Sequence, residues 1–146
     1  MKRTKIKRKS KTPLVKAKGK LWELCKQLVR KRDGHSCVSC GKTGLVGKGW
    51  HTGHFRPSAA CGGFLRYNLR NLHSQCKRCN INLGGNGGAY SLALERKYGK
   101  EFVLQIEKDM QKIIKLDIIF VQNKIDEYTG LLELSTKKLL EYTKSL

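Results

Sequence analysis

The chain has 146 residues and a formal net charge of +20, from 31 Lys or Arg against 11 Asp or Glu. This length is typical of one domain with appendages, and no apolar run approaches the roughly 18 residues of a transmembrane helix. The basic N-terminus is not followed by an apolar segment, so no secretory signal is expected. A membrane partner is therefore disfavoured, and a dense polyanion such as nucleic acid is the expected partner.

The positive charge is placed unevenly. Residues 1–20 carry ten Lys or Arg and no acid, residues 21–80 carry eleven against two acids, and residues 81–146 carry ten against nine. We expect residues 1–18 to form a disordered basic tail, because they lack periodic apolar spacing and repel one another. Contact with DNA phosphates is favoured over a purely solubilising role for this tail, because the core has the same sign of charge.

Residues 19–33 have the pattern of an amphipathic helix. Their apolar side chains recur at spacings of three and four: Leu21, Trp22, Leu24, Cys25, Leu28 and Val29. The following Asp33-Gly34 predicts the turn that ends the helix. Cys25 lies on the apolar stripe, so we interpret it as a packing residue and not as a metal ligand.

Four of the six cysteines form two C-x2-C pairs, Cys37 with Cys40 and Cys76 with Cys79. Because no export signal precedes them, metal ligation in a reducing cytosol is favoured over disulfides. Four thiolates close the coordination sphere of one structural Zn²⁺ and leave no open position for catalysis. Cys61 has no nearby partner and is expected to be a free thiol.

The remaining sequence predicts short strands and then helices. Strands are expected at residues 50–55 and 64–67, and helices at 76–83, 90–98, 102–113, 118–128 and 131–142. The apolar stripes of the later helices are assigned to core packing. A self-associating surface is the alternative, which leaves a homodimer open.

Three motifs resemble the HNH nuclease family: Gly53-His54-Phe55, Asn71-Leu72-His73, and Cys76-Lys-Arg-Cys79-Asn80. Over about residues 20–100 the chain is also similar to the NinG (Rap) recombination endonucleases of bacteriophages. That similarity rests on Arg30 to Gly34, Leu65-Arg66-Tyr67-Asn68, and Gly85-Asn86 before Tyr90. The resemblance implies an α+β fold, with a zinc-stapled ββα-metal core in a domain of residues 19–100. An N-terminal helix belongs to that domain, and residues 101–146 form a helical extension.

The resemblance implies a metal-dependent endonuclease that hydrolyses phosphodiester bonds in branched DNA, such as D-loops and Holliday junctions, in the cytoplasm of a bacterial host. His54 matches the general base, and a histidine pKa near 6.5 suits that task. Asn80 matches a ligand of the catalytic Mg²⁺ or Mn²⁺, and Asn71 matches the asparagine that braces the loop holding the base. The basic side chains expected to receive phosphates are Arg66, Arg70, Lys77 and Arg78.

One position departs from the family pattern. Many HNH enzymes carry an acidic metal ligand directly before the base, and this chain has Gly53 there. Either His73 or His51 supplies the missing ligand, or His54 itself binds the cation and another group acts as base.

Two other functions compete with the nuclease. A non-catalytic zinc-ribbon-like module that binds nucleic acid would account for the charge and the cysteines, but would not require His54, Asn71 and Asn80 at their family positions. A structural assembly protein that uses its C-terminal helices has the least support.

Overall fold

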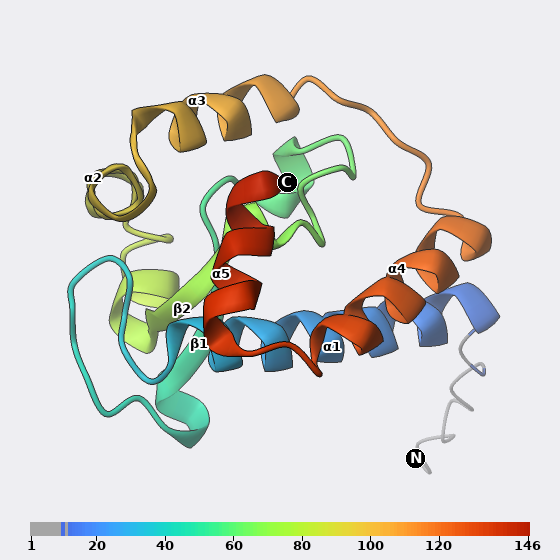
Figure 1. Cartoon of the computed structure of the whole chain (residues 1–146), viewed down its shortest axis with the longest axis horizontal. Helices are drawn as coiled ribbons and strands as arrows, with labels where there is room; N and C mark the ends of the chain where they lie inside the picture. Colours follow the sequence, from blue (N-terminus) through green and yellow to red (C-terminus); the bar gives the residue numbers. More distant parts are fainter. Residues whose placement is uncertain (1–9, 11) are drawn as a thin grey trace, which may run out of the picture.

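The computed structural model describes residue 10 and residues 12–146. In this part of the chain, helices surround a two-stranded antiparallel hairpin (Figure 1), which confirms the predicted α+β class. The elements are α1 (Pro13–Asp33), β1 (Trp50–His54), β2 (Leu72–Cys76), α2 (Gly87–Tyr98), α3 (Lys100–Asp109), α4 (Ile118–Leu131) and α5 (Thr136–Ser145). Four short turns of helix lie between them: η1 (Gly47–Gly49), η2 (Ser58–Ala60), η3 (Leu69–Asn71) and the π-helical η4 (Arg78–Asn82).

Helix α1 begins six residues earlier than the sequence pattern predicted. The Thr12 hydroxyl accepts a hydrogen bond from the Val15 amide at 3.3 Å, and Pro13 occupies the first turn, where its missing N–H costs nothing. Leu14 and Ala17 pack against the core, so the first turns are stabilised by burial. The predicted disordered tail is therefore wrong for residues 13–18. Residues 1–9 and 11 lie outside the described residues, and there the tail stays a prediction.

The strand predicted at residues 50–55 is confirmed as β1, which pairs with β2 from Trp50 opposite Cys76 to His54 opposite Leu72. The strand predicted at residues 64–67 is wrong. Successive turns occupy this segment, where the Arg66 amide donates to the Gly63 carbonyl and the Asn68 amide to the Leu65 carbonyl, both at 3.3 Å. The apolar residues there are buried by these turns and not by a sheet.

The later helices follow the predicted order with shifted ends. The helix predicted to 113 ends at Asp109, and Ile113 is 86% exposed. The last helix begins after Ser135, whose hydroxyl accepts from the Lys138 amide at 3.3 Å. The helix predicted at 76–83 is reduced to η4, since glycines follow it. None of the helices described here is long and apolar enough to cross a bilayer.

The end of α1 completes the outer edge of β2. The Arg32 guanidinium donates to the Leu72 carbonyl, the Asp33 carboxylate accepts from the Ser74 amide at 3.1 Å, and the Val38 amide donates to the Ser74 carbonyl at 2.8 Å. Arg32 and Asp33 also form an ion pair at 2.7 Å, with side chains 1% and 6% exposed. Backbone groups that an edge strand would leave unpaired are thus satisfied from the helix side.

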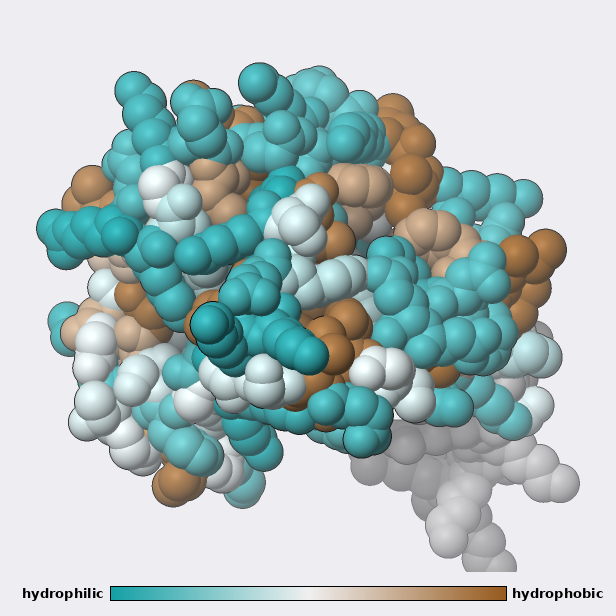
Figure 2. All heavy atoms as spheres, viewed as in Figure 1, coloured by the Kyte–Doolittle hydropathy of each residue, from teal (hydrophilic) through white to brown (hydrophobic). Residues whose placement is uncertain are grey.

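The two faces of the hairpin pack into two cores. One core joins the hairpin to α1, α4 and α5 and includes Leu28, Trp50, Leu72, Ile125 and Leu139. The other joins the loop after β1 to α2 and α3 and includes Phe55, Leu65, Tyr90, Leu94 and Ile106. Figure 1 shows α1 and α4 on one side of the hairpin and α3 on the other. Figure 2 shows this view of the molecule covered mainly by hydrophilic residues. The segment expected as a helical extension thus supplies part of both cores.

We predict that Asp33→Asn destabilises the fold by about 3–5 kcal/mol, because it leaves the buried Arg32 charge without its partner. Although burial alone would raise it, Arg32 holds the pKa of the Asp33 carboxyl well below its usual range. This contribution is therefore present above the unfolded pKa of about 3.9 and is lost as the pH falls below it. Urea unfolding at fixed zinc concentration measures the change. Glu23→Gln, which breaks the exposed pair with Lys26, should cost less than about 1 kcal/mol; equal losses in the two variants would contradict the prediction.

Candidate functional site

The four paired cysteines converge on one point. Their sulfur atoms all lie within 4.8 Å of one another, and the Sγ atoms of Cys40 and Cys76 are 3.8 Å apart. A tetrahedral Zn²⁺ with bonds of about 2.3 Å separates its sulfur ligands by about 3.8 Å. The donor set and its spacing therefore fit zinc, and this cluster could hold a structural metal of that kind. Four protein ligands leave such a metal no open position.

The cysteine cluster is assembled from three parts of the chain. Cys37 and Cys40 lie in the loop after α1, Cys76 ends β2, and Cys79 lies in η4. The Cys79 amide donates to the Cys76 sulfur and the Asn86 side-chain amide donates to the Cys79 sulfur, both at 3.4 Å. Burial alone would raise the pKa of Cys76, but hydrogen bonds from Cys79 and the other thiols lower it to about 7.

Asn86 belongs to the surroundings of this cluster. Its place among four glycines is equally typical of a flexible turn, so the sequence does not decide between a turn and a functional amide. It has a left-handed backbone with φ of 49° directly before α2, a conformation that asparagine adopts more readily than most residues. Hydrogen bonds to coordinating sulfurs hold ligands in place. The signal in the sequence was its position seven residues after Cys79.

His54 ends β1 and is held in one orientation. Its Nε2 lies 2.9 Å from the Arg66 carbonyl oxygen. Because a carbonyl can only accept, Nε2 carries the proton and Nδ1 keeps its lone pair. The Trp22 indole stacks on the imidazole with ring centroids 5.4 Å apart and planes 6° apart. Burial lowers the pKa of His54 below its usual value, so the ring is neutral at pH 7.

A pocket of about 380 Å³ opens beside His54, and it combines a neutral base with cations. Its lining consists of Lys18, Gly19, Trp22, His54, Ser58, Arg66 and Tyr67. Lys18 comes from α1, whereas the exposed Arg66 comes from the loop between the strands. Two cations beside a base suit an anionic substrate group such as a phosphate.

Asn71 connects the segments that position His54. It is fully buried, its side-chain oxygen accepts from the Arg56 amide at 2.7 Å, and its Nδ2 donates to the carbonyls of Arg56 at 2.9 Å and Leu65 at 3.3 Å. The first two bonds hold the loop that follows His54. The third holds Leu65, the residue before Arg66. The Arg66 carbonyl in turn accepts the hydrogen bond from His54 Nε2. Asn71 therefore braces the loop around His54.

His73 lies on the opposite face of the hairpin from His54. It pairs with Gly53, is fully buried, and has its Nδ1 3.1 Å from the Tyr90 hydroxyl, which donates to the Gly53 carbonyl at 2.9 Å. Burial lowers the pKa of His73 well below its usual value. The structure thus does not bring His54 and His73 into one metal site.

The other predicted ligands are also apart from His54. Asn80 follows the end of β2 at Cys76, whereas His54 pairs with the beginning of β2 at Leu72. His51 has its Nε2 3.2 Å from the Lys48 carbonyl. Across residue 10 and residues 12–146, the four cysteines are the one group of three or more His, Cys, Asp or Glu side chains whose donor atoms converge. These residues do not preassemble a Mg²⁺ or Mn²⁺ site.

The absence of a side chain at Gly53 has a steric reason. A Cβ atom built there would lie 1.9 Å from the Gln75 side-chain oxygen. The Gln75 Nε2 donates to the Ser39 hydroxyl at 2.7 Å and to the Gly85 carbonyl at 2.8 Å, which ties β2 to the cysteine loops. The space that an acidic ligand would need is thus filled by a glutamine with a structural role.

The four basic residues predicted to receive phosphates divide into two groups. Arg66, Lys77 and Arg78 are exposed, so their charges are accessible. Arg70 is 5% exposed, lies 3.6 Å from the Asp109 carboxylate, and donates to the Lys144 carbonyl at 3.2 Å. The prediction for Arg70 is wrong, because its guanidinium is buried against α3 and α5.

Comparison with known proteins shows the relationship of this chain. A family model described as Bacteriophage Lambda NinG protein matches residues 1–138. Protein ninG of Escherichia phage lambda is 40% identical over 82 residues, which cover 56% of this chain and 39% of the relative. Protein ninG of Salmonella phage P22 is 38% identical over 85 residues, which cover 58% of this chain and 40% of the relative.

The aligned segment thus spans about two fifths of the length of these curated relatives. No solved structure gives a significant match. Because the family model covers most of the chain, the protein belongs to the bacteriophage NinG family.

Proposed function

We propose that the protein is a metal-dependent DNA endonuclease of the HNH type that hydrolyses phosphodiester bonds in branched recombination intermediates. The observation that carries the proposal is the state of His54, which is neutral, fixed through Nε2, and free to accept a proton at Nδ1 beside two cations. A general base requires a lone pair directed at water and a pKa below the working pH. His54 lines an open pocket, keeps a lone pair on Nδ1, and has a pKa that burial lowers.

The arrangement of motifs gives further support. The order β1, β2 and then a helical segment, with Asn71 before β2 and Asn80 after the second cysteine pair, resembles the ββα-metal arrangement. A bare zinc ribbon has no need of a base held by a backbone carbonyl, a stacked indole and a bracing asparagine. We therefore favour an enzyme over a binding module.

In the proposed step, His54 Nδ1 takes a proton from water as the water oxygen attacks phosphorus. The bond from phosphorus to the 3′ oxygen breaks, leaving a 5′-phosphate and a 3′-hydroxyl that takes its proton from solvent. Lys18 and Arg66 stabilise the negative charge on the phosphoryl oxygens. The described residues that line the pocket at His54 include no carboxylate for Mg²⁺ or Mn²⁺, so no part of this step is assigned to a bound cation. The cation requirement rests on the family resemblance, with Asn80 as the proposed ligand.

We propose that the cysteine cluster binds one structural Zn²⁺ and that the protein acts in the cytoplasm of the phage-infected bacterium. Metal analysis of purified protein should give one zinc per chain. Cys76→Ala should lose the zinc and much of the fold, because structural zinc contributes folding free energy directly. Cys61→Ala, which removes a buried thiol outside the cluster, should keep it. Disulfides without metal, or zinc retained in Cys76→Ala, would contradict this assignment.

The nuclease proposal is tested by cleavage of a labelled four-way DNA junction in Mg²⁺ or Mn²⁺. His54→Ala should reduce the rate by about 10²–10⁴-fold, the usual contribution of a general base, whereas His51→Ala should retain cleavage. EDTA should abolish it, with zinc content measured in the same samples because EDTA can also remove the structural metal. If the wild-type protein binds the junction but never cuts it, the non-catalytic binding module is the correct function.

The pH dependence of cleavage provides a separate test. Burial lowers the pKa of His54, so the base is already neutral at pH 7. The cleavage rate should be level at neutral pH and should fall in acid with a midpoint below about 6.5, the usual value for histidine. A midpoint at or above that value would show that the titrating group is not the half-buried His54.

A further inference from the structure

The side of α1 that carries Trp22 has a row of residues in which Lys26 and Arg30 have no part in the proposed chemistry. Lys18, Trp22, Lys26 and Arg30 follow one another at intervals of four along the helix. Residues four apart lie on the same side of a helix, so the four form one continuous row. We call this row the α1 track.

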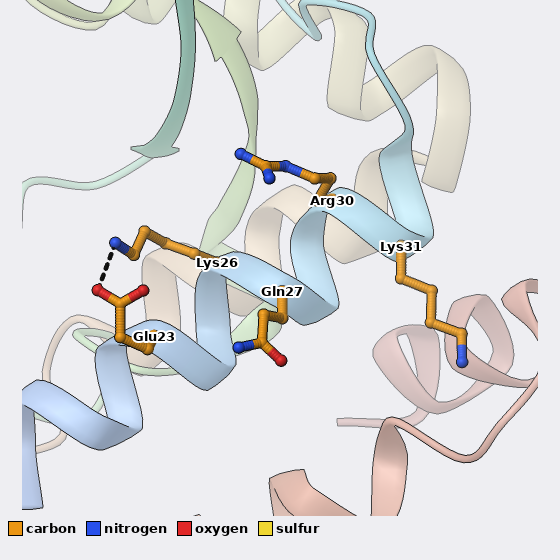
Figure 3. A pocket seen from close by; sticks show the side chains of 5 residues that line it. All are labelled: Glu23, Lys26, Gln27, Arg30 and Lys31. Carbon is orange, nitrogen blue, oxygen red and sulfur yellow. Dashed lines mark ion pairs between the residues drawn. The ribbon is translucent and has the colours of Figure 1, made fainter. Parts of the chain in front are cut away.

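The α1 track passes directly beside His54. Lys18 and Trp22 line the pocket at the imidazole, and Trp22 stacks on its ring. Lys26 and Arg30 line a second hollow of about 340 Å³ farther along the helix. Figure 3 shows these two side chains on the same side of α1, while Lys31 points away toward the C-terminal helices, where it donates to the Leu132 carbonyl. The base therefore has cations on both sides along the helix.

The cations of the track are available for an external anion. Arg30 is exposed, and its guanidinium lies 4.2 Å from the centroid of the Trp50 ring, which orients it without neutralising it. Lys26 pairs with Glu23 at 2.5 Å, but the Glu23 side chain is 62% exposed (Figure 3). An exposed pair of this kind contributes little and is easily exchanged for another anion.

The length of the track fits a nucleic-acid strand. Lys18 and Arg30 are twelve residues apart, which is about 18 Å along a helix. One strand of duplex DNA advances about 3.4 Å per nucleotide, so the track covers about five nucleotides. A membrane surface would need an exposed apolar face beside the charges, and apart from Val15 the large apolar side chains of α1 are buried or half-buried in the core.

We propose that the α1 track binds the backbone of one DNA strand, with Lys18 and Arg66 contacting the scissile phosphate beside His54 and with Lys26 and Arg30 contacting phosphates farther along the strand. This inference rests on the proposed function for the identity of the partner. It places the strand along α1, with the scissile phosphate in the pocket at His54 and the DNA continuing toward Arg30. Glu23 opposes binding by holding Lys26.

Binding is measured with His54→Ala protein, so that no cleavage occurs, on a four-way DNA junction over a range of salt concentrations. Each lost phosphate contact lowers the slope of log K against log salt by about 0.9. Lys26→Ala with Arg30→Ala should therefore lower the slope by about 1.8. The matched control is Lys100→Ala with Lys108→Ala, which removes two exposed charges from α3 on the other side of the hairpin and should leave the slope unchanged. Glu23→Gln should tighten binding.

Several results would overturn the track. An unchanged slope in the Lys26 and Arg30 variant, or an equal fall in the α3 control, would show that α1 holds no particular phosphates. Tighter binding to an RNA junction of the same sequence would reassign the partner. Cleavage by the wild-type protein is scored separately. If the protein never cuts but shows the expected slopes, the track is supported and the nuclease proposal is wrong. If it cuts but the slopes are unchanged, only the track is wrong.

Discussion

Arg32 and Asp33 end α1 by hydrogen-bonding to the outer edge of β2, which would otherwise present unpaired backbone groups. A hairpin of two five-residue strands is barely stable in water by itself. The sheet, the only one in the part of the chain that the structure describes, therefore depends on this attachment. The charges tolerate burial because each faces the other and also a backbone partner. The cysteine cluster fastens the opposite end, since Cys76 is the last residue of β2. The hairpin is thereby held to α1 along one edge and to the cysteine loops at one end.

The alternation of side chains in this hairpin separates two histidines that lie close in space but differ in chemistry. His54 faces the Trp22 side, where a pocket and two cations make it accessible to an anion. His73 faces the aromatic residues of α2 and α3, where its Nδ1 contacts Tyr90. A shift of β2 by one residue would turn His73 toward the α1 side and turn Leu72 out of its core. The edge contacts of Arg32 and Asp33 oppose such a shift, because they recognise Leu72 and Ser74 specifically.

The sequence predicted the features that depend on residues close together in the chain, and it missed a contact between residues that are far apart in the chain. Spacing alone predicted the cysteine cluster, β1 and the order of the helices, because these depend on local periodicity or on metal-ligand patterns. The same reasoning placed Arg70 among the phosphate contacts, since an arginine in a basic stretch is usually solvated. Its burial depends on Asp109, which lies 39 residues away in α3 and could not be paired with it from the sequence. The predicted start of α1 was wrong for a local reason. The Thr12-Pro13 cap was present in the sequence, but the surrounding lysines indicated a disordered tail.

Gly53 shows how the packing of one face constrains chemistry on the other. On the face of the hairpin opposite His54, which we call the inner face, Gln75 fills the space beside Gly53. Gln75 links β2 to Ser39 and Gly85 in the two cysteine loops. An acidic residue at Gly53 would displace that link and disturb the cysteine cluster that stabilises the hairpin. The side chains of the inner face therefore stabilise the fold and leave no room for an acidic ligand at Gly53. The functional groups that remain accessible to a nucleic acid are those on the α1 side, and they consist of the His54 imidazole, the half-buried Trp22 that stacks on it, and a row of cations. The proposed recognition of phosphate on this face therefore relies on Lys and Arg, whose charges require no carboxylate at Gly53.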